Sequence, residues 1–253
     1  MKNFLTSFVY GIIGIFLINS LAPIIIEVGL PIYWTFIAAF ILFSEIVVKL
    51  LLLQAVPDFI VSQTTLEEHS HLNLDTNLFN HYCQDLKAIG FEKLTDYTSP
   101  SIKGMARLFH HPEHDCYAEV GLLEGYPAFC SIVGGFEQNW FFAATNNNPS
   151  TNMKAISYAF LSLPRIMYKV FNEEPKLLLK SFLSWQSEIK SKLALETIAI
   201  ADEKLYFTWE KNKREMQRQR LMRKSIVVSL IKMFLFSLHP KSEWMGDYLK
   251  YSN

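Results

Sequence analysis

The chain has 253 residues, and its 24 lysine and arginine residues balance 24 aspartate and glutamate residues, so the formal net charge is zero. This length accommodates one ordinary domain together with a membrane module, and the balanced overall charge points to no particular partner. The apolar fraction of 50% is high for a fully soluble protein, and the excess is concentrated in the first 53 residues.

Two long apolar runs occupy the N-terminal part of the chain. Residues 4–26 hold no charged side chain, and a second run extends over residues 32–53 after a short break. As a helix, each run would be about 30 Å long, which matches the hydrocarbon core of a bilayer. The short break allows only an antiparallel arrangement, so we predict a transmembrane helical hairpin over residues 1–53.

Two other interpretations compete with the hairpin. The first run could be a secretory signal peptide, but it is longer than the apolar core of such a peptide, and Ala22-Pro23 makes a poor cleavage site. The runs could instead be core helices of a soluble protein, but a chain of this length has no core large enough to cover two helices that are apolar on all sides.

The second run contains one pair of opposite charges, Glu45 and Lys49. Four residues apart on a helix, they share a face and can pair, which lowers the cost of placing either in lipid. In this interpretation Lys49 reaches towards the headgroups and Glu45 neutralises it. The alternative is a proton or ion relay at Glu45, which two helices could form only by oligomerising.

Basic residues near the ends of the runs predict the orientation. Lys2 precedes the first run and Lys49 lies near the end of the second, whereas the break holds Glu27 and no basic residue. The positive-inside rule then places both termini in the cytoplasm and makes the chain an integral membrane protein with two spans. Three cysteines without CxxC spacing fit free thiols in a reducing compartment: Cys83, Cys116 and Cys130.

A polar stretch over residues 54–73 follows the apolar runs and is predicted to be a linker. A helix should then begin near Asp75 or Thr76, both good N-cap residues, and end at Gly90. Residues 74–253 are therefore expected to form the soluble domain.

From residue 91 to residue 146 the apolar period changes to two, and short turns separate the segments. Five strands are predicted over residues 91–97, 103–110, 116–123, 128–135 and 139–145, with a sixth within residues 155–169. Connections this short favour an antiparallel meander of about five or six strands. With helices flanking the sheet, the soluble domain belongs to the α+β class.

Helices return after Pro175. The first has an apolar face formed by Leu177, Leu178, Phe182, Trp185, Ile189 and Leu193, and a second begins around Asp202. The second carries a basic segment interrupted by the single acidic residue Glu215, which comprises Lys211, Lys213, Arg214, Arg218, Arg220, Arg223 and Lys224. An apolar segment over residues 226–238 follows directly, and His239-Pro240 ends the helix.

Four interpretations of the basic and apolar segments differ in what these segments contact. The favoured one is a helix in the membrane interface, with the basic segment facing anionic lipid headgroups. A third transmembrane helix is disfavoured because the apolar segment is short and contains Lys232. A helix that packs on its own domain with a solvated basic face is the structural alternative. Nucleic-acid binding is not expected, because the basic residues form only one short stripe.

Candidate chemistry is confined to residues 110–116, which combine three histidines, two carboxylates and a thiol. By residue type, His110, His114 and Cys116 could hold a transition metal. The segment lies at a predicted hairpin turn, where Pro, Asp and His are common for conformational reasons, so we predict neither a metal nor a cofactor. The sequence has no phosphate-binding loop and no Gly-x-Ser-x-Gly motif, and no catalytic residue can be named.

Three segments of the domain carry a resemblance: residues 85–97 with a helix end at Gly90-Phe91, residues 106–112 with an arginine strand and a histidine-proline turn, and residues 116–120. In these features the chain resembles a group of uncharacterised bacterial membrane-anchored proteins. The resemblance covers roughly residues 75–145 and implies a shared fold, with no known activity, ligand or catalytic residue.

The sequence therefore predicts a membrane-anchored protein whose α+β domain is a binding or scaffolding module at the cytoplasmic membrane surface. Its expected partners are the bilayer, anionic lipid headgroups and an unidentified membrane protein, because tethering raises the local concentration of such partners. Two alternatives remain open. One is a membrane-associated enzyme with a site on the sheet, and the other is an accessory subunit that contacts a membrane complex through Glu45 and Lys49.

Overall fold

The computed structural model describes residues 30–54, 56–99, 103–199 and 202–240, with the backbone alone for residues 30–33. The chain divides into two compact units, Met1–Ala55 and Val56–Asn253. The first predicted span, over residues 4–26, lies outside the described residues.

The described part of the first unit is one helix, α3 (Leu30–Gln54). Its segment Trp34–Gln54 has 21 residues and, by length and composition, is long and apolar enough to cross a membrane. At 1.5 Å per residue this segment is about 31 Å long. The Nζ atom of Lys49 lies 2.8 Å from Oε1 of Glu45, one helical turn away.

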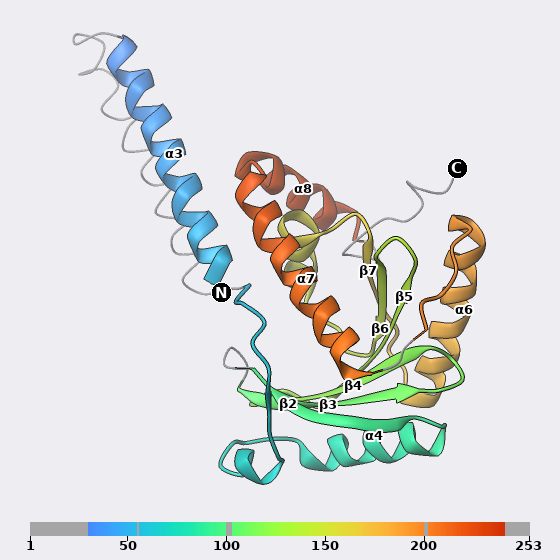
Figure 1. Ribbon diagram of the computed structural model, residues 1–253. Coiled ribbons are helices and arrows are strands. Elements are labelled where there is room, and N and C mark those ends of the chain that lie inside the picture. Colours follow the sequence, from blue (N-terminus) through green and yellow to red (C-terminus); the bar gives the residue numbers. More distant parts are fainter. Residues whose placement is uncertain (1–29, 55, 100–102, 200–201, 241–253) are drawn as a thin grey trace. The chain divides into compact units, whose positions relative to one another are not determined.

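The second unit is built on a seven-stranded mixed sheet in which the strands follow one another in chain order (Figure 1). The strands are β1 (Ser62–Gln63), β2 (Glu92–Thr98), β3 (Gly104–His111), β4 (Cys116–Leu123), β5 (Phe129–Phe136), β6 (Trp140–Thr145) and β7 (Ile166–Val170). Each of the first six pairs antiparallel with its sequence neighbour. The bounds of β2 to β6 lie within one residue of the five predicted strands.

The sheet differs from the predicted meander at both edges. β1 lies in the segment predicted to be a linker, where Ser62 and Gln63 pair with β2. β7 pairs parallel with β6, so the sheet is mixed. A parallel pair needs a crossover connection, and here the chain passes through α5 (Thr151–Ile156) and a π-helical segment, η2 (Ser157–Leu161), before β7 begins.

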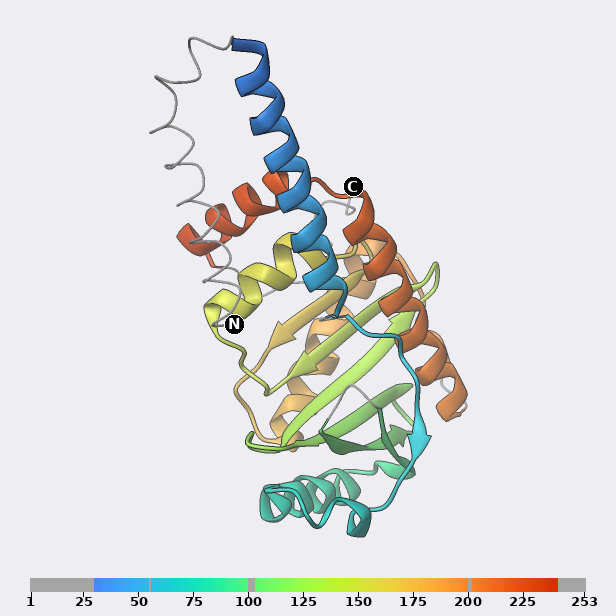
Figure 2. The same cartoon turned by 90° about the vertical axis from the view of Figure 1, so that its left-hand side faces the viewer.

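Helices cover both faces of this sheet (Figures 1 and 2). On one face, α4 (Thr76–Ala88) and α6 (Pro175–Leu193) bury a core that includes Phe79, Phe142 and Phe182. On the other face, α7 (Glu203–Arg223) buries a second core that includes Tyr117 and Phe141. The two cores arise because side chains alternate across each strand. The domain is therefore α+β, with a helix layer on either side of the sheet.

Local sequence signals explain where these helices begin. The Oδ1 atom of Asp75 accepts a hydrogen bond from the Leu78 backbone N–H at 3.2 Å at the start of α4. Asp202 caps α7 in the same way through Leu205, at 3.1 Å.

In α6, the buried face differs by one residue from the predicted face. Leu177 is 55% exposed, and Leu179 is buried in its place.

The basic segment and the apolar segment were predicted to form one helix, but the structure has two helices here. α7 ends at Arg223, and α8 (Ile226–Leu238) begins after a break at Lys224 and Ser225. The backbone of both break residues is extended, with ψ near 140° for Lys224 and near 130° for Ser225. The break separates the basic residues of α7 from the apolar residues of α8.

Candidate functional site

α7 presents a polar face to the sheet. Its buried side chains recur every three or four residues and are Tyr206, Glu210, Lys213, Gln217 and Leu221. This spacing places them on one side of the helix. Because burying a polar group without a hydrogen-bond partner is costly, each polar member needs a partner in the layer beneath.

Glu119 on β4 is the acceptor for two of these hydrogen bonds. The hydroxyl of Tyr97 on β2 donates to Oε2 of Glu119 at 2.6 Å, and the hydroxyl of Tyr206 on α7 donates to the same oxygen. Burial raises the pKa of Glu119, and the two hydroxyl donors oppose that rise. Burial and the Glu119 charge hold the pKa of both tyrosines well above its ordinary value. Both tyrosines thus keep their protons as donors, and they join α7 to two strands.

Lys213 forms the second polar contact between α7 and the sheet. Its ammonium group pairs with Glu210 on the same helix and donates to the hydroxyl of Tyr168 on β7 at 2.7 Å. The Nζ atom also lies 5.0 Å from the ring centroid of Phe141. Burial acts to lower the pKa of Lys213, but the charge of Glu210 and the hydrogen bonds to Glu210 and Tyr168 together outweigh burial, so the pKa is raised. Lys213, predicted to face lipid, is therefore a buried cation that fastens α7 to β7.

Two arginines of the basic segment are also used within the domain. The guanidinium group of Arg218 donates to the Val56 carbonyl at 3.0 Å and lies 3.2 Å from a carboxylate oxygen of Asp58. The guanidinium carbon of Arg214 lies 5.0 Å from the ring centroid of Phe59. Both contacts hold the segment before β1 against α7. Of the remaining basic residues, Lys211 and Arg223 are exposed and Arg220 is half-buried.

Lys224 lies at the junction of α7 and α8 and contacts the π-helical segment. Its Nζ atom donates to the carbonyl oxygen of Ala159 at 3.0 Å and approaches that of Phe160 at 3.5 Å. Burial and the positive charges of Arg220 and Lys232 lower the pKa of Lys224 to about 8. Lys224 is therefore a half-buried cation at the junction that is affected by the charges of Arg220 and Lys232.

The amine of Lys224 is expected to titrate near pH 8 in the full-length protein in neutral detergent, as followed by NMR of isotope-labelled lysine side chains. Because this pKa lies below the ordinary lysine value of about 10.4, the unfolded chain binds more protons between these two pH values, and stability rises with pH there. The variant Lys224→Gln identifies the resonance. Titration of that resonance at an ordinary lysine pKa would contradict the burial of Lys224 at the junction of α7 and α8.

α8 is mostly apolar, and one of its apolar sides is exposed to solvent. Ile226, Ser229 and Phe236 are buried, and the ring of Phe236 lies 5.0 Å from that of Tyr158. Six apolar side chains on the opposite side are each more than half exposed: Val227, Val228, Ile231, Phe234, Leu235 and Leu238. These residues repeat at i, i+1, i+4, i+7, i+8 and i+11, so they form one continuous face, called here the α8 apolar face.

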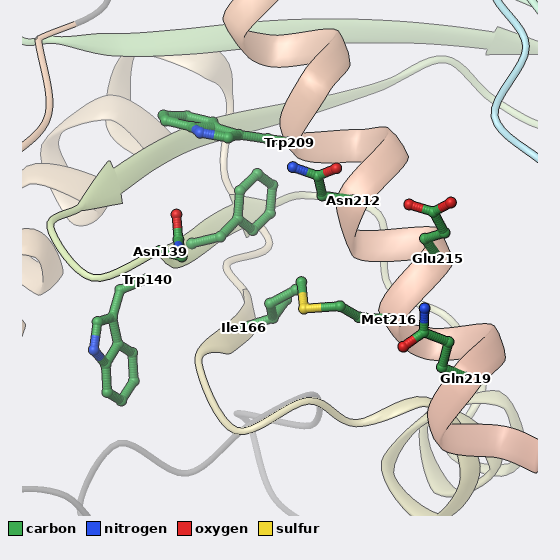
Figure 3. A pocket seen from close by; sticks show the side chains of 9 residues that line it. Asn139, Trp140, Ile166, Trp209, Asn212, Glu215, Met216 and Gln219 are labelled. Carbon is green, nitrogen blue, oxygen red and sulfur yellow. The ribbon is translucent and has the colours of Figure 1, made fainter. Parts of the chain in front are cut away.

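A pocket of about 240 Å³ lies beside α7, over the adjoining ends of β6 and β7 (Figure 3). Trp209 and Phe141 form perpendicular walls, with ring centroids 5.9 Å apart. Met216 of α7 points towards Ile166, and the polar lining residues are Asn139, Asn212, Glu215 and Gln219. The pocket is small and holds no pair of groups suited to acid–base chemistry.

The three residues of the candidate metal cluster do not share one face of the sheet. His110 is paired with Tyr117 and His111 with Cys116, so His110 and Cys116 point to opposite faces. The ring of His114 lies 4.3 Å from that of His111, whose Nε2 atom lies 3.0 Å from the Ile89 carbonyl oxygen. Burial raises the pKa of the Cys116 thiol, which keeps it protonated.

Within the described part of the chain, one group could hold a metal ion by geometry: His81, Asp85 and Glu174. His81 and Asp85 are four residues apart on α4, a spacing that the sequence shows. Glu174 precedes α6 and is brought to them only by the packing of α6 beside α4. The spacing of His81 and Asp85 can therefore be recognised in the sequence, but nothing in the sequence places Glu174 beside them.

No family model matches this chain, and neither a curated protein nor a solved structure matches it.

Proposed function

We propose that this protein is a membrane-anchored binding module that works at the cytoplasmic surface of the membrane and uses α8 as a second contact with lipid. The anchor would be the transmembrane hairpin of residues 1–53, with both termini in the cytoplasm. The observation that carries the proposal is the α8 apolar face, which lies on the surface of a domain whose chain also contains α3.

Burial of the α8 apolar face in lipid would be favourable. Six large apolar side chains are exposed side by side on one helix, and exposed patches of this kind mark contacts with membranes or partners. Removing one Val, Leu, Ile or Phe side chain from water contributes about 1.5–3 kcal/mol. α8 has 13 residues and is therefore about 20 Å long, too short to span a bilayer but suited to lie in its interface.

The basic residues beside α8 favour a membrane surface that carries negative charge. The positive charges of Arg220 and Lys232 both act on Lys224, which precedes α8, and Arg223 is exposed at the end of α7. Each Lys or Arg close to an anionic membrane surface contributes about 1 kcal/mol of attraction. The proposed contact is therefore with anionic lipid, and it is made by the α7–α8 junction and α8 rather than by the whole basic segment of α7.

The proposal is tested with the full-length protein in lipid nanodiscs, labelled with an environment-sensitive fluorophore on Phe234→Cys. The three native cysteines are buried, which directs the label to the new site. We expect a blue-shifted emission and strong quenching by lipids that carry a quencher in the acyl chain. The matched control is Leu177→Cys on α6, which replaces a similarly exposed apolar residue away from α8 and is expected to show neither effect.

Charge dependence is tested in the same nanodiscs. Quenching at position 234 should be stronger with anionic than with neutral lipid, and it should weaken when Arg223 and Lys232 are both replaced by Gln. Equal quenching at positions 234 and 177, or none at either, would reject a lipid contact by α8. A label at position 234 that is shielded from both water and lipid would point instead to a protein partner on this face.

A further inference from the structure

We infer that His81, Asp85 and Glu174 form a binding site for one divalent transition-metal ion of the zinc type, which links α4 to α6. Each residue offers one ligand atom, and the three atoms lie within 4.8 Å of one another. This site is on the sheet face opposite α7 and is independent of the proposed membrane contact.

The distances suit a small transition-metal ion. Bonds from Zn²⁺ to imidazole nitrogen or carboxylate oxygen are about 2.0–2.2 Å long, so two ligand atoms in a tetrahedral site are roughly 3.4 Å apart. The Nε2 atom of His81 and the Oδ2 atom of Asp85 are 3.5 Å apart. The ligand atom of Glu174 lies within 4.8 Å of the other two, and because this side chain is exposed it is free to move closer when a metal binds.

The helices that carry the ligands are held by the core. α4 buries Phe79 and Leu86, and α6 buries Leu178 and Phe182, all in one cluster on the same face of the sheet. Glu174 is the N-cap residue of α6, but its side chain makes no capping hydrogen bond. The carboxylate lies instead with His81 and Asp85 across the α4–α6 contact.

The charge in the group favours a cation. Two carboxylates lie close together, and in the part of the chain that the structure describes neither Asp85 nor Glu174 forms an ion pair with a lysine or arginine. By contrast, the carboxylate of Glu173, the residue before Glu174, accepts a hydrogen bond from Ser181 at 2.6 Å. A bound dication would relieve the repulsion between the two carboxylates.

The donor set restricts which metal is expected. One imidazole nitrogen with two carboxylate oxygens suits Zn²⁺, Fe²⁺ or Mn²⁺, whereas Mg²⁺ and Ca²⁺ prefer all-oxygen sites. Since His81 and Glu174 are exposed, water can occupy the remaining coordination positions. The metal would join two helices whose ligands are 93 residues apart in the chain, counted from His81 to Glu174.

The test uses the full-length protein in detergent, freed of metal by a chelator, with Zn²⁺ alone as the probe. Calorimetry should show one site per chain, and the Tm should rise by ~5 °C or more at a Zn²⁺ concentration about 100 times the Kd. His81→Ala and Glu174→Gln should each weaken binding at least tenfold. Their side chains are exposed, so both variants should keep the circular dichroism spectrum of the parent.

Three controls test whether Zn²⁺ binds at this site rather than elsewhere on the protein. His71→Ala removes an exposed histidine outside the group and should leave binding unchanged, as should His114→Ala in the β3–β4 turn. Mg²⁺ and Ca²⁺ should not raise the Tm. An equal rise in Tm with Mg²⁺ would mean that the three residues are a non-selective acidic patch and would overturn the inference of a transition-metal site. Zn²⁺ binding that survives both His81→Ala and Glu174→Gln, or is lost in His114→Ala, would overturn the inference.

Discussion

Replacing Lys213 by Met is expected to lower the free energy of unfolding by about 3–5 kcal/mol, because the change leaves the Glu210 carboxylate buried without its cation. Lys213 is 8% exposed and Glu210 is 7% exposed, so solvent cannot take over the role of the missing partner. Tyr168 loses the same ammonium group as a hydrogen-bond partner. The measurement is denaturant unfolding of the full-length protein in mild detergent, followed by the near-ultraviolet signal of the buried aromatic residues.

Two further variants identify the cause of that loss. Lys211→Met makes the same change at an exposed position two residues earlier on α7, and it should shift stability by no more than about 0.5 kcal/mol. Combining Lys213→Met with Glu210→Gln removes both charges and should recover most of the loss. If the double variant is as unstable as Lys213→Met alone, the unpaired carboxylate is not the reason.

Replacing Phe142 by Ala is expected to lower the free energy of unfolding by about 3–5 kcal/mol. Phe142 is fully buried and stacks on Phe136 and Phe182, with ring centroids 4.8 and 4.9 Å away. It also meets the ring of Trp185 edge-on at 5.8 Å. The substitution leaves a cavity between the sheet and α6, and the same unfolding measurement reports its cost.

Phe234→Ala on α8 is the matched control, because it is the same substitution at a side chain that is 63% exposed. It should leave the free energy of unfolding within about 0.5 kcal/mol of the parent while weakening the contact of α8 with lipid. A large loss of stability in Phe234→Ala would mean that α8 is covered by its own chain. A small effect of Phe142→Ala would contradict the packing of α6 on the sheet.

The buried polar contacts of α7 connect the fold to the proposed membrane contact. Tyr206 and Lys213 hold α7 to β4 and β7, and Lys224 binds the π-helical carbonyls just before α8 begins. Because α8 follows after two extended residues and buries Phe236 against Tyr158, its apolar face is presented in one direction. The polar network then orients the surface helix, and the apolar residues of α8 would make the proposed contact.

Short-range patterns in the sequence were sufficient for most elements of the soluble unit. An apolar period of two identifies β2 to β6, and Asp75 and Asp202 mark the starts of α4 and α7, since strand alternation and helix capping depend on residues within a few positions of one another. The length and composition of α3 are equally local properties. These signals determined the α+β class and the presence of an apolar helix long enough to cross a membrane.

Contacts between residues far apart in the chain decided the rest. The sequence places Lys213 in a basic segment predicted to face lipid, but packing brings it to Tyr168, 45 residues away. Glu119 likewise contacts Tyr206, 87 residues away. The parallel pairing of β7 and the approach of Glu174 to His81 likewise depend on how the layers pack. A side chain's type and spacing determine which face of an element it occupies, but only the packed layers determine whether that face meets water, a partner charge or another helix.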